Sequence, residues 1–412
     1  MENFVYPKYK GESLLNVPST ILSLFKSQPL HETLPKEYYA NVEGVEKVVL
    51  FIADGLGFNL FEKEALKYPF FQKLVRKGLY HKLTSVFPAS TAPALNTIYS
   101  GLSPLEHGLI EWYMYFKELD SIVESLPFTV VLGKKQEELA KAPKNILFSG
   151  KNIFQQLEEK DVSSFFFCDR SYINSFYNEK TALGSNKCGY RTMANFMVSL
   201  RKHLMETKGK AYFSAYWPDP DGTEHNFGPD SEEVTAEISQ ISYMLDKEFI
   251  EKVDSKTAEK TAFFLVADHG QVGNDPQNTF YLNNIEGFEE NLKISPKGNL
   301  ILPWGYLRDC YLNVKEERLE KLKNLLEDKI GNIAKIMTIE EALKQQLFGS
   351  GEMHPKFLDR VGNLIILPFE NNLVYYRYKP ESTSHLKGFH GGLSSDEMFI
   401  PFISARLSDL KD

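Results

Sequence analysis

Two apolar runs that each lead into an aspartate constrain the fold of this chain more than any other feature. Residues 45–53 (VEKVVLFIA) precede Asp54, and residues 262–267 (AFFLVA) precede Asp268. A continuous apolar run of this length is typical of a parallel strand buried on both faces, with the polar residue in the loop at its carboxyl end. The pattern therefore predicts a buried parallel sheet with polar side chains at its carboxyl edge.

The rest of the chain alternates between strand and helix patterns. Further strands are predicted at 83–86, 162–168 and 211–217, and helices at 58–77, 193–206 and 231–253. This alternation implies right-handed crossovers, and so an α/β fold with an open, mostly parallel sheet and helices on both faces. In such sheets, ligands bind outside the carboxyl ends of the strands.

The pattern changes after residue 273. Strands are predicted at 311–314 and 334–338, with a charged amphipathic helix at 315–330 between them. A strand-helix-strand unit of this kind indicates an inserted α+β element.

This change suggests a division of the chain. We expect residues 1–273 and 355–412 to form the main α/β core and residues 274–354 to form an inserted cap. Within the returning part of the core, 361–368 and 374–378 are expected to be strands of the main sheet.

Charge and cysteine usage restrict the partners and the compartment. The net charge of -8 argues against general affinity for duplex nucleic acid or an anionic membrane. The three cysteines are too few and too scattered for a disulfide framework or a cysteine metal site. The amino-terminal residues lack a secretory signal pattern, and no apolar run reaches about 18 residues. We therefore expect a soluble, cytoplasmic protein.

Residues of the metal-ligand type stand in the loops after the predicted strands and in a late Phe-His-Gly-Gly segment. The candidate ligands are Asp54, Asp221, His225, Asp268, His269 and His390. Imidazole nitrogen together with carboxylate oxygen suits Zn²⁺, and Mn²⁺ also accepts such a set. Six ligands exceed what one tetrahedral ion needs. The count therefore predicts two ions, which about 3.5–4 Å apart clamp the attacking and leaving oxygens of a phosphoryl displacement.

The candidate nucleophile is Thr91, in the segment FPASTAPALN (87–96). Thr91 is predicted to be a helix N-cap, with Pro93 just inside the helix. There its hydroxyl would meet free backbone N–H groups and the positive end of the helix dipole, which favour an alkoxide. The neighbouring Ser90 is the alternative nucleophile.

Each of these motifs alone also has a purely structural interpretation. An Asp-Gly pair after a strand is most often a turn, a Ser-Thr pair before Ala-Pro is most often a helix cap, and Asp221 with His225 is most often a solvated pair. Their joint occurrence in one chain favours the functional interpretation.

The order of the motifs resembles the alkaline phosphatase superfamily, specifically its type I phosphodiesterase/nucleotide pyrophosphatase branch. The resemblance runs from about residue 45 to residue 401, and its strongest stretch is FPASTAPALNTIYSGLSPLEHG (87–108). It implies an alkaline-phosphatase-like fold and hydrolysis of phosphodiester or pyrophosphate bonds in small phosphate-ester or nucleotide substrates.

The resemblance also implies roles for individual residues. Thr91 would attack phosphorus and form a covalent phosphothreonine, which water then hydrolyses. Asp54, Asp268 and His269 would hold the ion that also binds the Thr91 oxygen. Asp221, His225 and His390 would hold the other, with Asp221 preferred to Asp219 because it stands four residues before His225.

One position departs from the branch. Members often carry Asn three residues after the nucleophile, where this chain has Ala94, and Asn96 would point to another side of the helix. We therefore expect the backbone N–H of Ala92 to help bind the phosphoryl oxygens.

Substrate-binding residues are sought among the cations and the aromatic side chains. The absence of Arg or Lys next to Thr91 favours a diester or pyrophosphate over a monoester, although Arg170, Arg191 or Arg308 could reach the site from other loops. The indoles of Trp112 and Trp304 are candidates for stacking on a nucleotide base or another planar leaving group.

Other functions remain open at this point. A phosphomonoesterase, phosphonate hydrolase or phosphotransferase is compatible with the same scaffold, whereas a sulfatase needs a modified Cys or Ser motif that is absent. A non-catalytic metal-binding or partner-binding domain would lack a ligand or the nucleophile, and this chain has all of them. The oligomeric state is not indicated.

Overall fold

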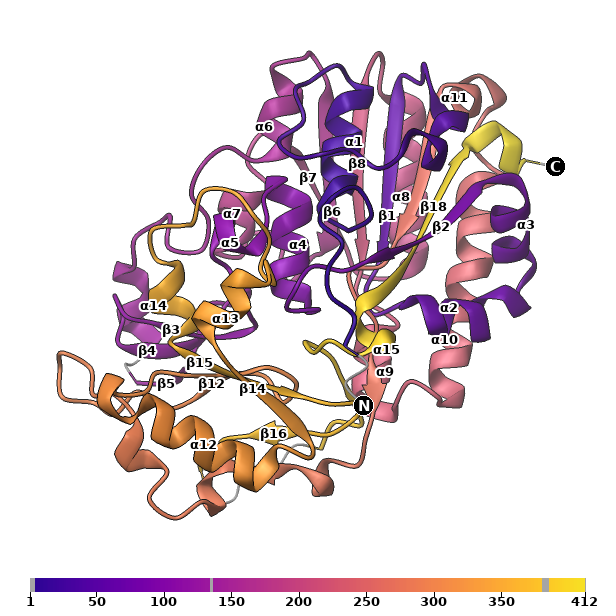
Figure 1. Ribbon diagram of the computed structural model, residues 1–412. Coiled ribbons are helices and arrows are strands. Elements are labelled where there is room, and N and C mark those ends of the chain that lie inside the picture. The colour runs from indigo at the N-terminus through magenta and orange to yellow at the C-terminus, as the bar shows by residue number, and fades with distance from the viewer. Residues whose placement is uncertain (1–3, 134–135, 380–384, 412) are drawn as a thin grey trace.

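A seven-stranded sheet forms the centre of the computed structural model, which describes residues 4–133, 136–379 and 385–411 (Figure 1). Its strands, in spatial order, are β2 (Leu79–Thr84), β18 (Phe399–Arg406), β9 (Thr261–Val266), β1 (Lys47–Ala53), β8 (Ala211–Trp217), β6 (Ser163–Asp169) and β7 (Asn186–Tyr190). β18 runs antiparallel to its neighbours β9 and β2, and the other pairs are parallel. The predicted α/β fold with a mostly parallel sheet is confirmed.

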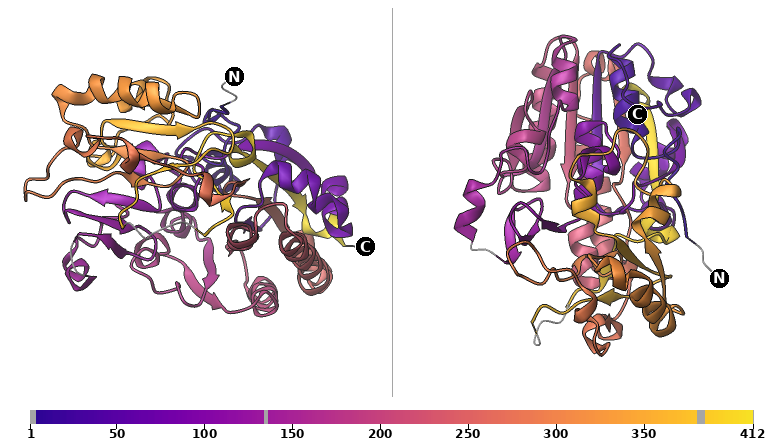
Figure 2. Two further views of the ribbon diagram at one scale, coloured as in Figure 1. Left: turned by 90° about the horizontal axis from the view of Figure 1, so that it is seen from below. Right: turned by 60° about the vertical axis from the view of Figure 1, so that its left-hand side comes forward.

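Helices cover both faces of this sheet, as Figure 2 shows. Along β6, Phe165 and Phe167 contact His203 of α8 (Met193–Glu206), whereas Phe166 contacts Tyr99 of α4 (Thr91–Ser100). Successive side chains of a strand point to opposite faces, so α8 and α4 lie on opposite sides. Both faces of the central strands are consequently apolar and buried, as the sequence pattern requires.

Two of the predicted helices that pack on the main sheet have different limits in the structure. The predicted helix 58–77 is divided into α2 (Phe58–Lys63) and α3 (Pro69–Lys77), because Pro69 starts a new helix at its first position. The predicted helix 231–253 is α10 (Glu232–Tyr243), followed by a π-helical segment (Met244–Ile250). The others are α1 (Asn16–Leu24), α5 (Pro104–His107), α6 (Ile153–Glu158), α7 (Asn178–Thr181), α9 (Asp221–Phe227), α11 (Ser255–Glu259) and α15 (Ser395–Met398).

A second, four-stranded sheet lies beside the main one, on the side of α9 and α15 (Figure 1). Its strands, in order, are β12 (Trp304–Gly305), β13 (Cys310–Leu312), β15 (Leu364–Pro368) and β14 (Ala334–Thr338). The helices α12 (Leu319–Ile330), α13 (Ile339–Lys344) and α14 (Phe357–Val361) accompany it. Its own apolar cluster includes Leu312, Leu326 and Ile366.

The expectation that 361–368 and 374–378 return to the main sheet is wrong. β15 pairs with β13 and β14, and β16 (Val374–Tyr375) pairs with β11 (Phe280–Tyr281). The strands themselves were predicted, but an apolar run does not reveal which sheet it will join. The division into a core of 1–273 and 355–412 and a cap of 274–354 stays a prediction.

The structure also contains a three-stranded sheet and a two-stranded sheet outside the two larger ones. β3 (Tyr113–Phe116), β4 (Ser121–Glu124) and β5 (Thr129–Leu132) form an antiparallel sheet, and β10 (Val272–Gly273) pairs with β17 (Gly388–Phe389). The β10–β17 pair joins the segment after Asp268 to the segment before His390. It therefore brings two parts of the chain more than 100 residues apart to one place.

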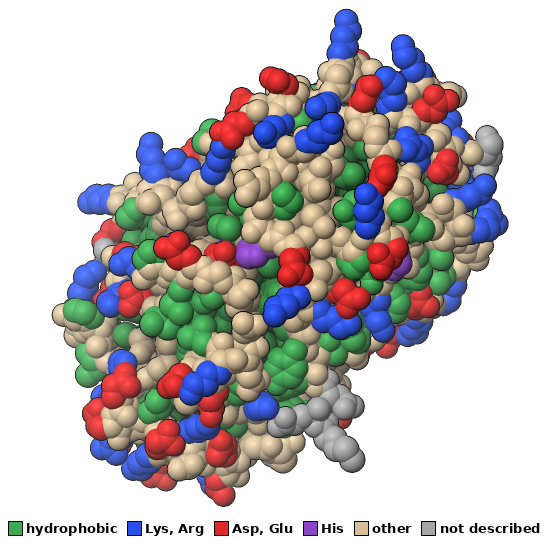
Figure 3. Space-filling model, turned by 45° about the horizontal axis from the view of Figure 1, so that its top comes forward, with side chains coloured by type: hydrophobic (Ala, Val, Ile, Leu, Met, Phe, Trp, Pro, Cys, Tyr) green, Lys and Arg blue, Asp and Glu red, His purple; other side chains and the backbone are tan. Residues whose placement is uncertain are grey.

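On the face shown in Figure 3, acidic and basic side chains are interspersed. All three cysteines are free thiols, two of them buried. Within the described ranges, no helix has the length and apolar character needed to cross a membrane.

Candidate metal centre

Three central strands bring the first ligands together because they end at the same level. Ala53 of β1 is level with Trp217 of β8, and Ile52 is level with Val266 of β9. Asp54 and Asp268 follow β1 and β9, and Asp221 opens α9 just after β8. The backbone closes this arrangement, since the Asp221 N–H donates to the Asp54 carbonyl at 3.0 Å.

Gly55 permits this close approach. Its φ of +77° lies in the left-handed region, and a Cβ there would stand 2.8–2.9 Å from the backbone and Cβ of Asp221. Only glycine satisfies both conditions without strain. The glycine that follows Asp54 is therefore required by the close approach of Asp221 as well as by the turn.

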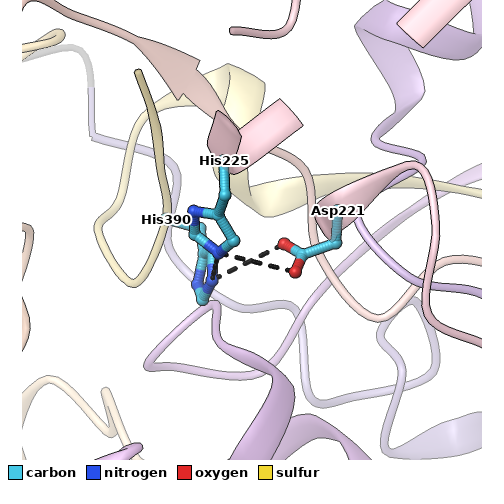
Figure 4. Close-up of side chains that lie close together, drawn as sticks. All are labelled: Asp221, His225 and His390. Carbon is cyan, nitrogen blue, oxygen red and sulfur yellow. Dashed lines mark hydrogen bonds and ion pairs between the residues drawn. The ribbon is translucent and has the colours of Figure 1, made fainter. Parts of the chain in front are cut away.

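One group of candidate ligands contains Asp221, His225 and His390 (Figure 4). His225 Nε2 lies 3.4 Å from Asp221 Oδ2 and 3.2 Å from His390 Nε2. His390 Nε2 lies 3.7 Å from Asp221 Oδ1. Three ligand atoms of the types that Zn²⁺ prefers thus converge on one point.

A second group contains Asp54, Asp221 and His269. His269 Nε2 lies 3.4 Å from Asp54 Oδ1 and 3.5 Å from Asp268 Oδ2. Asp221 belongs to both groups, so the two sets adjoin, and the rings of His269 and His390 stack at 4.0 Å. The structure therefore brings all six predicted ligands to one place, with Asp221 between the two sets.

Neighbouring groups orient the ligands. The imidazoles of His225 and His269 place Nδ1 against the carbonyls of Gly388 and Gly270, at 2.8 and 3.1 Å, which leaves each Nε2 facing the centre. The Tyr216 hydroxyl donates to Asp54 Oδ2, and the Gln271 amide donates to the Asp221 carboxylate. Neither residue was singled out from the sequence, because each reaches its ligand through tertiary packing.

The electrostatics of the centre suit a divalent cation. Burial raises the pKa of Asp54, and the charges of Asp268 and Asp221 raise it further. Burial also raises the pKa of Asp268 and, with the neighbouring histidines, lowers the pKa of His390 well below its usual value. Asp54 Oδ1 and Asp268 Oδ2 are buried and accept no hydrogen bond from the described residues. A bound cation would satisfy these oxygens and offset the repulsion.

Thr91 lies against this centre. It is the first residue of α4, and its Oγ1 stands 3.1 Å from His269 Nε2. The N-cap is Ser90, not Thr91 as predicted, because Ser90 has extended backbone angles and Thr91 is already helical. The Ser90 hydroxyl donates to Glu111 Oε1 at 2.7 Å, whereas the Thr91 hydroxyl faces the ligands.

The other sequence candidates have different positions. Ala92 is the second residue of α4, where a backbone N–H has no partner within the helix. Asp219 accepts from the Thr223 hydroxyl and belongs to neither ligand group. Trp304 is fully buried and donates to the Arg360 carbonyl, so the structure does not bring it to the site. Arg308 is also fully buried, in an ion pair with Glu397.

A cavity of about 250 Å³ opens beside Thr91, Asp54 and Asp221. Trp112 lines it, and so do Tyr99, Phe166, Tyr172, Tyr177 and Tyr216. Polar atoms come from Asp169, Ser175 and Asn178, and neither Lys nor Arg lines the cavity within the described part of the chain. The Thr91 hydroxyl therefore stands at one wall of a mainly apolar cavity that six aromatic side chains help to line.

The fold and these residue groups define an alkaline-phosphatase-like α/β protein. The chain belongs to the type I phosphodiesterase/nucleotide pyrophosphatase family, whose model matches residues 48–393. Members of this family depend on metal ions.

Part of the chain is similar in sequence to curated members of the ectonucleotide pyrophosphatase/phosphodiesterase group. The chain is 24% identical over 250 residues to human ectonucleotide pyrophosphatase/phosphodiesterase family member 1, a match that covers 60% of this chain and 26% of the relative. A Caenorhabditis elegans ectonucleotide pyrophosphatase/phosphodiesterase is 23% identical over 193 residues, covering 46% and 22%. The chain thus matches only about a quarter of the length of these curated relatives.

Solved structures share the fold. An inactive variant of murine ectonucleotide pyrophosphatase/phosphodiesterase 5, in complex with AMP, superposes with a TM-score of 0.63 at 17% identity, covering 87% of this chain and 88% of that one. The human protein of the same name superposes with a TM-score of 0.64, covering 87% of each chain.

Proposed function

We propose that the protein is a two-metal hydrolase of phosphodiester or pyrophosphate bonds in nucleotide-type substrates, with Thr91 as its nucleophile. The observation that carries this proposal is the position of the Thr91 hydroxyl, 3.1 Å from Nε2 of His269, a member of one of the two adjoining ligand groups. Family membership supports the same reaction class.

Two divalent ions, proposed to be Zn²⁺ with Mn²⁺ as the alternative, would neutralise charge at the attacking and leaving oxygens. Asp221, His225 and His390 are proposed to hold one ion. Asp54, Asp268 and His269 are proposed to hold the other, with Asp221 close to both.

The protein residues carry the remaining steps. The Thr91 hydroxyl releases its proton to solvent, and its oxygen bonds to phosphorus as the bond to the leaving group breaks. The leaving group takes a proton from solvent, and water then cleaves the phosphothreonine ester and restores the hydroxyl. At the amino-terminal end of α4, the backbone N–H of Ala92 and the helix dipole favour the negative charge on the phosphoryl oxygens.

The cavity supports the choice of substrate. Its aromatic walls suit a planar base, with Trp112 the stacking candidate. The lack of a lining cation favours a diester, since the extra charge of a monoester commonly recruits a guanidinium. The AMP complex of the murine relative is consistent with a nucleotide ligand.

The test compares bis(p-nitrophenyl) phosphate with p-nitrophenyl phosphate, with Zn²⁺ supplied and a chelator as control. We expect faster hydrolysis of the diester and loss of activity with chelator. A preference for the monoester would keep the two-metal chemistry but make the protein a phosphatase. Activity that persists in chelator would contradict the metal-dependent mechanism.

A further inference from the structure

The turn between β12 and β13 of the second sheet lies against the metal centre. The ring of Tyr306 in this turn stands 5.7 Å from that of His390 and 6.4 Å from that of His225. We propose that Arg308, in the same turn, is a positioning residue for the metal ligand His390, acting through Glu397. This inference rests on the metal centre proposed above and makes the second sheet a part of it.

The contact between Arg308 and Glu397 is a buried two-point ion pair. Arg308 Nε donates to Glu397 Oε1 at 2.9 Å, and Nη2 donates to Oε2 at 2.7 Å. Both side chains are 0% exposed. The guanidinium also donates to the carbonyls of Glu370 and Asn372, so the plane of its fork is fixed.

Glu397 transmits this restraint to the segment that follows His390. Its Oε1 accepts from the Gly392 N–H at 2.8 Å, and its Oε2 accepts from the Ser394 hydroxyl at 2.7 Å. A single carboxylate thus binds Arg308 on one side and the backbone two residues after His390 on the other.

The packing of this segment leaves little freedom. A Cβ at Gly392 would stand 2.8 Å from Glu397 Oε2 and 3.0 Å from Arg308 Nη2. A Cβ at Gly391, where φ is +112°, would stand 2.9 Å from Asp309 Oδ1. The two glycines of the Phe-His-Gly-Gly motif therefore let the β12–β13 turn seat directly on the backbone that carries His390.

A purely structural role is the alternative interpretation. Glu397 also caps α15 through Ser394, and a buried ion pair that loses one partner costs several kcal/mol whatever its function. The two roles differ in what they predict for metal binding. A positioning role lowers the affinity of the His390 site for its ion, whereas a structural role lowers the stability of the metal-free fold alone.

Arg308→Lys is the variant to test, because it keeps the charge but loses the two-point fork. The matched control is Arg360→Lys. Arg360 is equally buried, but it donates to the carbonyls of Gly108 and Ile146, which are not in the metal centre. The metal-free proteins are titrated with Zn²⁺ against a chromophoric chelator, and the melting temperature of each metal-free protein is recorded.

We expect Arg308→Lys to weaken one of the two Zn²⁺ affinities by about 10- to 100-fold. The other Zn²⁺ affinity of Arg308→Lys should stay within about threefold of wild type. Both Zn²⁺ affinities of Arg360→Lys should also stay within about threefold of wild type. At low Zn²⁺ the turnover number of Arg308→Lys should fall with little change in KM, and added Zn²⁺ should restore it. If Arg308→Lys does not fold, Glu397→Gln replaces it, since it keeps the shape and removes the charge.

Two Zn²⁺ affinities equal to wild type in the Arg308 or Glu397 variant would overturn the positioning role, as would an equal loss in Arg360→Lys. A wild-type protein that binds no Zn²⁺ would instead overturn the proposed metal centre itself. The titration therefore separates failure of this inference from failure of the proposed function.

Discussion

The carboxylate of Asp54 illustrates what the metal centre requires of a single residue. One oxygen accepts from the Tyr216 hydroxyl, and the other is buried without a hydrogen-bond partner among the described residues. The hydroxyl therefore fixes the rotation of the carboxylate and leaves one oxygen for an ion. Loss of such a supporting group commonly lowers metal affinity by about 10- to 100-fold.

Removing this hydroxyl should weaken metal binding. We expect Tyr216→Phe to lower Zn²⁺ affinity by about 10-fold or more, because Asp54 can then rotate away from the site. The measurement is Zn²⁺ titration of the metal-free protein. Tyr212→Phe is the control, since Tyr212 is buried on the same strand four residues earlier. Equal affinities for Tyr216→Phe and wild type would show that Asp54 needs no such support.

At this scale, the sequence predicts ligands better than it predicts their supports. The candidate ligands are chemically distinctive and follow strands directly, so that the pattern alone selects Asp54, Asp268 and His269, which lie together in the structure. Tyr216 and Gln271 are ordinary residues in the sequence, and their contacts with Asp54 and Asp221 join segments that are distant in the chain. The prediction that Trp304 contacts the substrate fails for the same reason. Trp304 is fully buried, and the local sequence does not reveal this.

Helix α4 is the element that carries Thr91, the proposed nucleophile. All ten of its residues are buried, and the following helix α5 holds it through His107, whose Nε2 lies 3.1 Å from the Thr97 hydroxyl. The Leu109 N–H donates to His107 Nδ1, which makes that nitrogen an acceptor. Burial, together with His354 and Arg360, lowers the pKa of His107 to about 3.

This depressed pKa predicts an acid-sensitive contact. Below the unfolded-state pKa of about 6.5, the unfolded chain binds a proton at His107 that the folded chain does not, so stability falls as pH falls. Between pH 6.5 and pH 5 the loss amounts to about 2 kcal/mol. His107→Gln should remove this part of the pH dependence.

The measurement is urea unfolding of both proteins at pH 7 and pH 5 under the same metal conditions. The difference between the two pH values should be about 2 kcal/mol smaller for His107→Gln than for wild type. An identical pH dependence in the two proteins would mean that His107 is protonated in the fold or does not contribute.

Strands with a continuous apolar run were the most predictable elements. The strands β1, β8 and β9 lie where their apolar runs stand, because burial on both faces leaves a continuous signal. The limits of α4 shifted by one residue, since Ser90 and Thr91 are both good caps and the backbone angles decide between them. The pairing of β15 could not be foreseen, because its partners are set by the packing of the second sheet.

The whole molecule joins two sheets around a concentrated negative charge. Asp54, Asp221 and Asp268 converge with no Lys or Arg ion pair to any of them among the described residues. The turn between β12 and β13 closes the other side of this centre. Metal binding should therefore stabilise the complete fold as well as support the reaction.

Removal of metal should lower the melting temperature. An ion present at 100 times its dissociation constant adds about 2.7 kcal/mol of stability, which corresponds to roughly 3 °C for a chain of this length. The measurement is thermal unfolding with Zn²⁺ and after chelation. The difference in melting temperature between the two conditions should be smaller for Asp221→Asn, because this substitution weakens a ligand common to both groups. Identical melting temperatures with and without Zn²⁺ in the wild-type protein would contradict a resident metal centre.

The central claim is that Thr91 performs the reaction while other residues hold the metal. Its most direct test is the rate of diester hydrolysis by Thr91→Ala, measured with the bound Zn²⁺ content of the same preparation and with Ser90→Ala as control. We predict that Thr91→Ala loses about a thousandfold or more in turnover with its metal content unchanged, whereas Ser90→Ala keeps most of its activity. A Thr91→Ala protein that retains a tenth of the wild-type rate, or a Ser90→Ala protein that alone is inactive, would contradict it.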